Sequence, residues 1–95
     1  MVRRYLEPAV RDMEHYINTK IHPQLMNRTV VSRVVLGEVM RDAGRPPASF
    51  RGLTRWEKAT VMSAALRNLG WRRYSGYNRY RINAWTLPGG VHGVS

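Results

Sequence analysis

Positively charged side chains are concentrated in one segment of this 95-residue sequence, residues 45–81. That segment holds nine Lys or Arg residues and one acid, Glu57. Residues 1–44 hold seven basic and five acidic residues, and residues 82–95 carry no formal side-chain charge. Cations that contact phosphates release condensed counterions, which favours binding to a nucleic-acid backbone. With a formal net charge of +10, the chain is expected to bind a polyanion, nucleic acid in particular.

Within this segment, residues 55–69 predict a helix with one face suited to contact with DNA. Thr54 and Glu57 form a capping box at its start, and Gly70 ends it. The face expected to be buried holds Trp56, Ala59, Met62, Ala65, Leu66 and Leu69. The opposite face holds mostly short side chains: Thr60, Ser63, Ala64, Arg67 and Asn68. Short side chains let a helix approach base edges, and Arg and Asn can make bidentate contacts with bases.

Basic residues on either side of this helix could hold phosphates. Arg55 and Lys58 lie in its first turn, where backbone N–H groups also favour an anion. After the helix the residue pattern changes to a period of two, which predicts a β-hairpin with strands 71–74 and 79–85 joined by residues 75–78. The arginines of this hairpin are Arg72, Arg73, Arg79 and Arg81.

The expected hairpin register pairs Tyr74 with Arg79 and so places Arg72 opposite Arg81. Like charges directly opposite each other destabilise a hairpin. A phosphate held between the two arginines would remove that repulsion. Tyr77, at the expected loop tip, could stack on a base or simply be exposed.

The N-terminal third of the chain predicts one helix followed by a connector. Apolar residues recur at helical spacing over residues 7–18, which we expect to be helical. They are Leu6, Val10, Met13 and Ile17. Residues 18–29 contain Asn and Pro residues and are expected to form a connector without regular structure.

The middle of the chain predicts a short extended stretch, a second helix and a loop. Val30 and Val31 form a short β-branched stretch, long enough for one isolated β-bridge. Ser32 is a typical N-cap for a helix over residues 33–43. Residues 45–53 contain two prolines and a glycine and predict a loop. Trp71 is expected to lie in the core.

The expected order of elements is helix, short strand, helix, helix and hairpin. This order predicts an α+β, mainly helical fold, a winged helix–turn–helix made of three helices and a C-terminal β-hairpin wing. In that arrangement the third helix, residues 55–69, enters the major groove and the wing, residues 71–85, lies along the backbone or the minor groove. We expect one domain over residues 1–87 and a mobile, Gly-rich tail over residues 88–95.

Several function classes are not expected. The chain has no cysteine, and its three histidines, His15, His22 and His92, are widely spaced and lack ligand partners, so we expect no metal. No paired carboxylates, Ser/His/Asp arrangement or phosphate-binding Gly-rich loop is visible, so we expect neither a cofactor nor an enzyme. No apolar run is long enough to span a membrane and no signal peptide is recognisable, which predicts a cytoplasmic protein of a bacterium or a phage-infected cell.

Short motifs spread over residues 7–87 carry a family resemblance. They are Glu7-Pro8, His15-Tyr16-Ile17, Val30-Val31-Ser32, Val61-Met62, the run from Leu66 to Arg73, Arg79-Tyr80-Arg81 and Trp85. Together they resemble the C-terminal end of virulence-associated-E-like proteins, which are primase-helicases of phages and mobile elements. None of the motor or primase motifs of that family is present here. The resemblance therefore implies a DNA-binding accessory module, either an excised terminal domain or a small stand-alone phage-type protein.

The sequence thus predicts a winged-helix domain that binds duplex DNA in the replication or transcriptional regulation of a mobile element. Two alternatives stay open. The domain could instead dock a partner protein, such as a helicase of a replication complex, because winged helices also serve as interaction modules. It could also bind RNA, although it lacks the four-stranded platform that usually stacks single-stranded bases.

Overall fold

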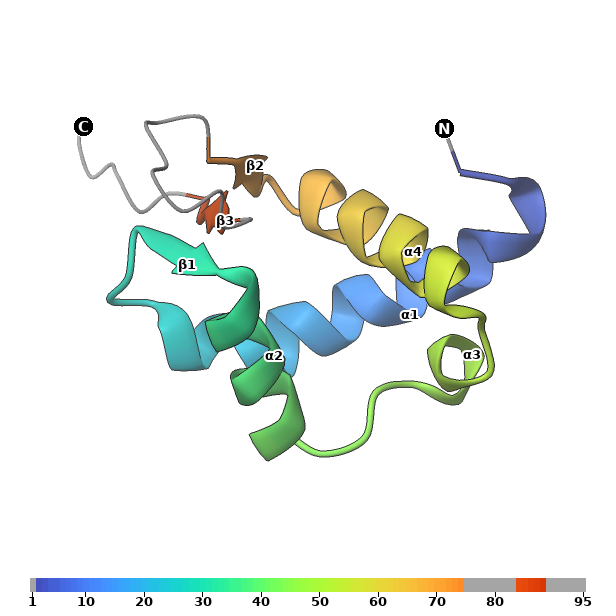
Figure 1. Ribbon diagram of the computed structural model, residues 1–95, viewed down its shortest axis with the longest axis horizontal. Coiled ribbons are helices and arrows are strands. Elements are labelled where there is room, and N and C mark those ends of the chain that lie inside the picture. Colours follow the sequence, from blue (N-terminus) through green and yellow to red (C-terminus); the bar gives the residue numbers. More distant parts are fainter. Residues whose placement is uncertain (1, 75–83, 89–95) are drawn as a thin grey trace.

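The computed structural model describes residues 2–74 and 84–88 of the chain (Figure 1). These residues form a small, mostly helical α+β domain with a three-stranded antiparallel sheet. The predicted hairpin loop, with Tyr77, Arg79 and Arg81, lies outside the described residues, as does most of the predicted tail. Among the described residues, no helix is long and apolar enough to cross a membrane.

The first helical region is longer than the sequence predicted. A 3-10 turn over Arg4–Leu6 leads into α1, Glu7–Tyr16, which continues as a π-helical turn over Ile17–Ile21 and a 3-10 turn over His22–Leu25. The predicted helix is confirmed, but the prediction of a connector over residues 18–29 is wrong for residues 18–25, which form helical turns. Ile21 and Leu25 are buried, so the apolar face of α1 continues through these turns, and Pro23 is tolerated because it lies at the start of a turn.

Helix α4, Arg55–Asn68, has the ends that the sequence predicted. The Thr54 hydroxyl accepts a hydrogen bond from the Glu57 amide at 3.2 Å, and the Glu57 carboxylate accepts one from the Thr54 amide at 3.0 Å. At the other end Gly70 has a φ of +95°, and the Trp71 amide donates to the Leu66 carbonyl at 3.0 Å. This is the Schellman arrangement, in which a left-handed residue lets the chain turn back over the last helical turn.

Gly70→Ala should lower the free energy of unfolding by about 1–2 kcal/mol, because alanine is strained at this positive φ. A Cβ at position 70 would also lie 3.2 Å from the Pro88 Cβ. Gly37→Ala is the control, since Gly37 lies inside a helix and an added Cβ there meets no atom within 4 Å. It should raise stability by up to about 1 kcal/mol. Urea denaturation of both variants measures the contrast, and two shifts of the same sign would contradict the strain at Gly70.

The buried face of α4 matches the predicted one in part: Ala65 and Leu66 are buried as predicted, and Met62 and Leu69 pack against the core. Val61 is also buried, whereas Trp56 is 63% exposed and Ala59 is exposed. Apolar residues surround this helix on all sides, so their spacing alone could not select the face that meets α1. The buried face is determined by the packing of α4 against α1 and against the short helix that directly precedes α4. As a result the indole of Trp56 lies outside the core that it was expected to join.

The sheet joins three short strands in the order β1-β3-β2. They are β1, Val30–Ser32, β2, Arg72–Arg73, and β3, Ala84–Thr86. The central strand pairs with both neighbours, and β1 is therefore a full strand rather than the predicted isolated bridge.

The hairpin register also differs from the predicted one. Arg72 pairs with Thr86 and Arg73 with Trp85, and the Tyr74 amide donates to the Ala84 carbonyl at 3.0 Å. The predicted Arg72–Arg81 pair is therefore wrong. Register follows the buried side chains, because a one-residue shift exchanges the two faces of a strand. Here Trp85 is 6% exposed and Val31, its partner on β1, is 1% exposed.

Helix α2, Arg33–Asp42, begins at the predicted cap, where the Ser32 hydroxyl accepts from the Val35 amide at 3.2 Å. The predicted loop over residues 45–53 contains a further short helix, α3, Ala48–Arg51. Phe50 in α3 is buried. Burial of this apolar side chain holds the Pro-rich stretch against the core, which the turn-forming residues of the stretch did not indicate.

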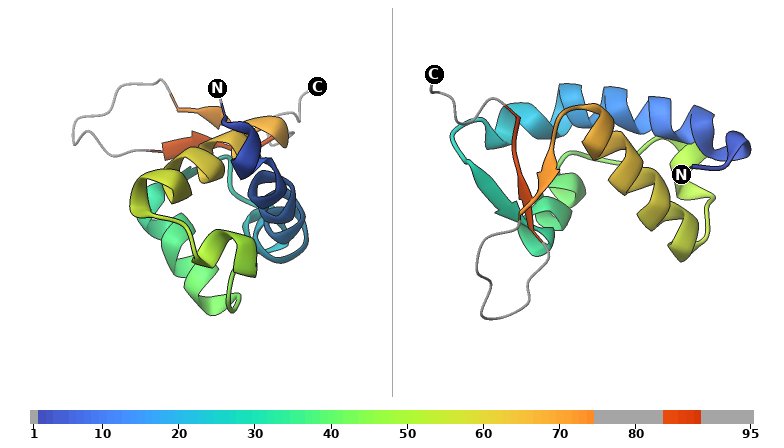
Figure 2. Two further views of the ribbon diagram at one scale, coloured as in Figure 1. Left: turned by 90° about the vertical axis from the view of Figure 1, so that its right-hand side faces the viewer. Right: turned by 90° about the horizontal axis from the view of Figure 1, so that it is seen from above.

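The strands lie at one end of the molecule and the N-terminal turn and α3 at the other (Figures 1 and 2). α1 and the turns that follow it run along the length between them, and α4 crosses α1. α4 and β2 diverge from their junction, the short segment that contains Gly70 (Figure 2, right). Trp71, at this junction, is fully buried, as the sequence predicted.

Candidate nucleic-acid interface

The outer side of α4 borders a groove of about 480 Å³, which we call the α4 groove. It contains the four helix residues that the sequence predicted to face bases, Thr60, Ser63, Arg67 and Asn68. The complete lining is Val2, Trp56, Ala59, Thr60, Ser63, Ala64, Arg67 and Asn68. The structure thus brings the predicted helix residues together on one hollow surface, with the N-terminal Val2 at its edge.

A second groove, of about 340 Å³, lies along the adjacent face of α4, shares Ala59 and Ser63 with the first, and is called the basic groove here. Four cations from three elements line it: Arg33 from α2, Arg55 and Lys58 from α4, and Arg73 from β2. The other lining residues are Leu36, Ala59, Met62, Ser63 and Trp85. None of these described lining residues is acidic, so the groove is a concave surface of one sign of charge. Such a surface concentrates anions.

Two of the four cations occupy positions where helix stability does not favour them. Arg33 is the first residue of α2 and Arg55 the first residue of α4. The N-terminus of a helix carries a partial positive charge, so a cation there is mildly unfavourable. Both side chains are exposed. Helix stability therefore does not explain these two arginines.

The other two cations rest on aromatic rings. The Lys58 ammonium lies 5.8 Å from the centre of the Phe50 ring, and the Arg73 guanidinium lies 5.3 Å from the centre of the Trp85 ring. These cation–π contacts restrict the two side chains. The aromatic residues of α3 and β3 thus position two of the charges in the basic groove.

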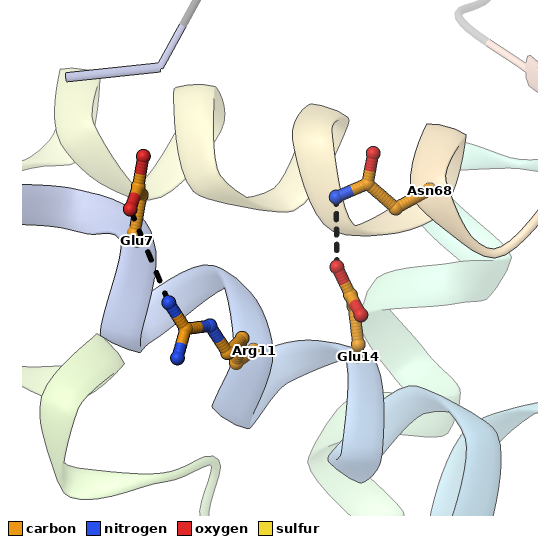
Figure 3. A network of polar contacts seen from close by, with 4 residues as sticks. All are labelled: Glu7, Arg11, Glu14 and Asn68. Atoms are coloured by element: carbon orange, nitrogen blue, oxygen red, sulfur yellow. Dashed lines mark hydrogen bonds and ion pairs between the residues drawn. The ribbon is translucent and has the colours of Figure 1, made fainter. Parts of the chain in front are cut away.

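In the α4 groove, two of the predicted base-facing residues already have partners. The Thr60 hydroxyl donates to the Trp56 carbonyl at 3.1 Å. The Asn68 amide donates to the Glu14 carboxylate of α1 at 2.7 Å, beside the Glu7–Arg11 ion pair (Figure 3). The Asn68 amide group is thus directed toward α1, which leaves Arg67 as the exposed long polar side chain at this end of the groove.

A contact between Tyr5 and Glu57 holds the N-terminal turn against the beginning of α4. The Tyr5 hydroxyl donates to the Glu57 carboxylate at 2.5 Å. This bond and the one from the Thr54 amide hold the pKa of Glu57 below its usual range. The same bond raises the pKa of Tyr5, because ionising the phenol would remove the donated proton. The only acid of the basic segment is therefore an ionised cap, as the sequence predicted.

The structure adds residues that the sequence analysis did not single out for the interface. Arg33 was missed because it lies outside the basic segment, although its position directly after the Ser32 cap was a usable signal. Trp56 was assigned to the core from its spacing. Arg72, a predicted phosphate contact, is exposed but lines neither groove, and its guanidinium donates to the Trp71 carbonyl at 3.1 Å.

The chain matches no known family model, no curated protein and no solved structure. The likeness to virulence-associated-E-like proteins therefore stays a prediction from short motifs. In the part of the chain that the structure describes, no group of three or more His, Cys, Asp or Glu residues could hold a metal ion. The fold and the two grooves define a small basic α+β domain with a cationic concave surface beside an exposed helix.

Proposed function

We propose that this domain binds duplex DNA through α4 and the basic groove, as a variant of the winged helix. The observation that carries the proposal is the basic groove itself. Four cations from α2, α4 and β2 converge on a concave surface whose described lining residues include no acid. It lies directly beside the α4 groove, where Ala59, Thr60, Ser63 and Ala64 are short. Phosphate contacts from such a surface would fix the register of a helix lying in the major groove.

The order and pairing of the elements support the winged-helix part of the proposal. A winged helix forms its small sheet from a strand that precedes the second helix and a C-terminal hairpin. The sheet order β1-β3-β2 has this pattern, with β1 directly before α2 and the β2–β3 hairpin after α4. In this proposal Arg73 lies at the base of the wing.

The connection between α2 and α4 differs from a standard helix–turn–helix. Such motifs join their two helices by a turn of about three to four residues. Here residues 43–54, including α3, connect them. The extra helix buries Phe50 and places its ring beneath Lys58, so in this variant the long connection helps to position a cation of the proposed interface.

A role in the replication or transcriptional regulation of a phage or mobile element is part of the proposal. It is supported only by the motif resemblance to virulence-associated-E-like proteins. In such a setting the domain would act in the cytoplasm as a DNA-binding accessory module without catalytic activity of its own.

A salt titration of binding tests the proposed function. The probes are a blunt DNA duplex of about 20 base pairs and an RNA duplex of the same sequence, with affinity measured by fluorescence anisotropy. We expect DNA binding to weaken steeply with salt, with a log–log slope of about −0.9 for each phosphate contact. We expect weaker binding to the RNA duplex, because its deep and narrow major groove does not admit a helix.

Two results would contradict this function. Absence of DNA binding at low salt, despite the net charge of +10, would assign the grooves to a protein partner. Equal or tighter binding to the RNA duplex would favour the RNA alternative.

A further inference from the structure

Trp56 is the exposed member of the three tryptophans. Its side chain is 63% exposed, whereas Trp71 is fully buried and Trp85 is 6% exposed. Tryptophan has the largest apolar surface of any residue, and most of that surface is usually covered in a folded domain. The exposure of Trp56 therefore leaves a large aromatic surface accessible to a ligand.

The backbone beneath Trp56 is firmly held, so the ring is presented from a fixed position. Trp56 lies in the first turn of α4, between the two residues of the capping box. Its carbonyl accepts a hydrogen bond from the Thr60 hydroxyl. The next residues along the groove, Ala59 and Ala64, are too small to cover an indole. The result is an aromatic platform that needs little ordering when a ligand binds.

The charges around the α4 groove favour an anionic ligand. Arg55 directly precedes Trp56, and Arg67 lines the same face of α4 about three helical turns further along. Among the described residues, those that line the groove include no Asp or Glu. The chemistry required of a ligand is thus a flat aromatic group attached to a negatively charged backbone. A nucleotide has this chemistry, and bases stack on aromatic side chains without regard to sequence.

In a duplex both faces of each base are already stacked on neighbouring bases, so a free face exists only where a strand is unpaired. We propose that the α4 groove binds an unpaired base of a single-stranded segment next to the duplex, with Trp56 as the stacking surface and Arg67 as a phosphate contact. The inference rests on the proposed DNA-binding function and names its substrate, a junction between duplex and single-stranded DNA.

The test compares a blunt duplex with the same duplex carrying a short single-stranded thymidine overhang, at either the 3′ or the 5′ end. For the unmodified protein we expect one overhang duplex to bind at least about fivefold more tightly than the blunt one, the lower end of the effect of stacking one base. Trp56→Ala should remove this advantage, so that the variant binds the blunt and the overhang duplex with equal affinity. Trp56→Phe should keep part of it, since the smaller ring still stacks.

Val34→Ala is the matched control, because Val34 is 67% exposed on α2 and lines neither groove. It should leave both affinities unchanged. No overhang advantage in the unmodified protein, or an advantage that survives in Trp56→Ala, would overturn the inference. An equal loss on blunt and overhang duplexes would also overturn it and would make Trp56 a duplex contact, with the proposed function intact. Failure of the unmodified protein to bind any DNA would instead overturn the proposed function.

Tryptophan fluorescence gives a second readout of the same site. Because Trp71 and Trp85 are buried, quenching by a thymidine oligonucleotide should come mainly from Trp56. Trp56→Phe should abolish most of this quenching. Undiminished quenching in that variant would contradict stacking at the α4 groove.

Discussion

Trp71→Ala should lower the free energy of unfolding by about 3–5 kcal/mol, the usual cost of truncating a buried Trp. Trp71 is fully buried where α4 ends, and its ring meets His22 edge to face at 5.7 Å between ring centres. A domain of this size has a total stability of about 5–15 kcal/mol. We therefore expect the melting temperature to fall by more than about 10 °C in calorimetry.

The same substitution at Trp56 is the control for this prediction. Trp56→Ala removes the same atoms from a side chain that is 63% exposed, and it should change stability by less than about 0.5 kcal/mol. Similar losses for the two alanine variants would contradict the assignment of Trp71 to the core and of Trp56 to the surface.

Trp71→Phe separates the packing of the ring from its polar group. The indole N–H is buried and has no hydrogen-bond partner among the described residues, which is a cost to the folded state. Phenylalanine removes that cost and keeps most of the apolar surface. We expect it to destabilise the domain clearly less than alanine does, as measured by the same thermal unfolding.

The beginning of α2 and both ends of α4 could be predicted from sequence because they depend on neighbouring residues. The Thr54–Glu57 capping box and the Ser32 cap are both observed, and Gly70 has the positive φ that its place after α4 required. Each of these features closes a hydrogen bond within a few residues. No distant part of the chain is needed to form it.

The hairpin register and the complete buried face of α4 could not be predicted because they depend on distant contacts. β3 is positioned by its pairing with β1, which lies more than fifty residues earlier, so the spacing between Tyr74 and Arg79 was uninformative. The helix was apolar on several sides, and only its packing on α1 placed Val61 inside and Trp56 outside.

The candidate interface was predicted only in part, because it too depends on contacts between distant parts of the chain. Arg55, Lys58 and Arg73 belong to the basic segment and were each predicted as DNA contacts, the first two at the helix start and Arg73 in the hairpin. Arg33 joins them only because β1 and α2 fold back beside α4, and it comes from the part of the chain with nearly balanced charge. A groove built from three elements is a property of the fold, so composition alone could not reveal its full set of cations.

Reversing two charges of the basic groove should abolish most DNA binding without unfolding the domain. Arg33→Glu with Arg55→Glu removes two proposed phosphate contacts and adds two repulsive charges. Charge-assisted hydrogen bonds contribute about 1.5–3 kcal/mol each, so we expect an affinity loss of about 100-fold or more. In the neutral counterpart, Arg33→Ala with Arg55→Ala, the salt slope should decrease by about two units.

The position of these arginines makes loss of folding a poor explanation for such a result. Both are the first residues of helices, where a carboxylate interacts favourably with the helix dipole and arginine does not. The double reversal should therefore leave the melting temperature unchanged or slightly higher. An unfolded double variant would contradict this electrostatic assignment of the two positions.

The control for net charge is Lys20→Glu with Arg28→Glu. These exposed residues lie on the turns before β1, outside both grooves, and their reversal changes the total charge by the same amount. It should weaken DNA binding far less than the groove variant, because screening limits charge interactions to about 10 Å at moderate salt. Equal losses in the two double variants would show that net charge alone governs binding. That result would contradict the proposal that the basic groove is the interface.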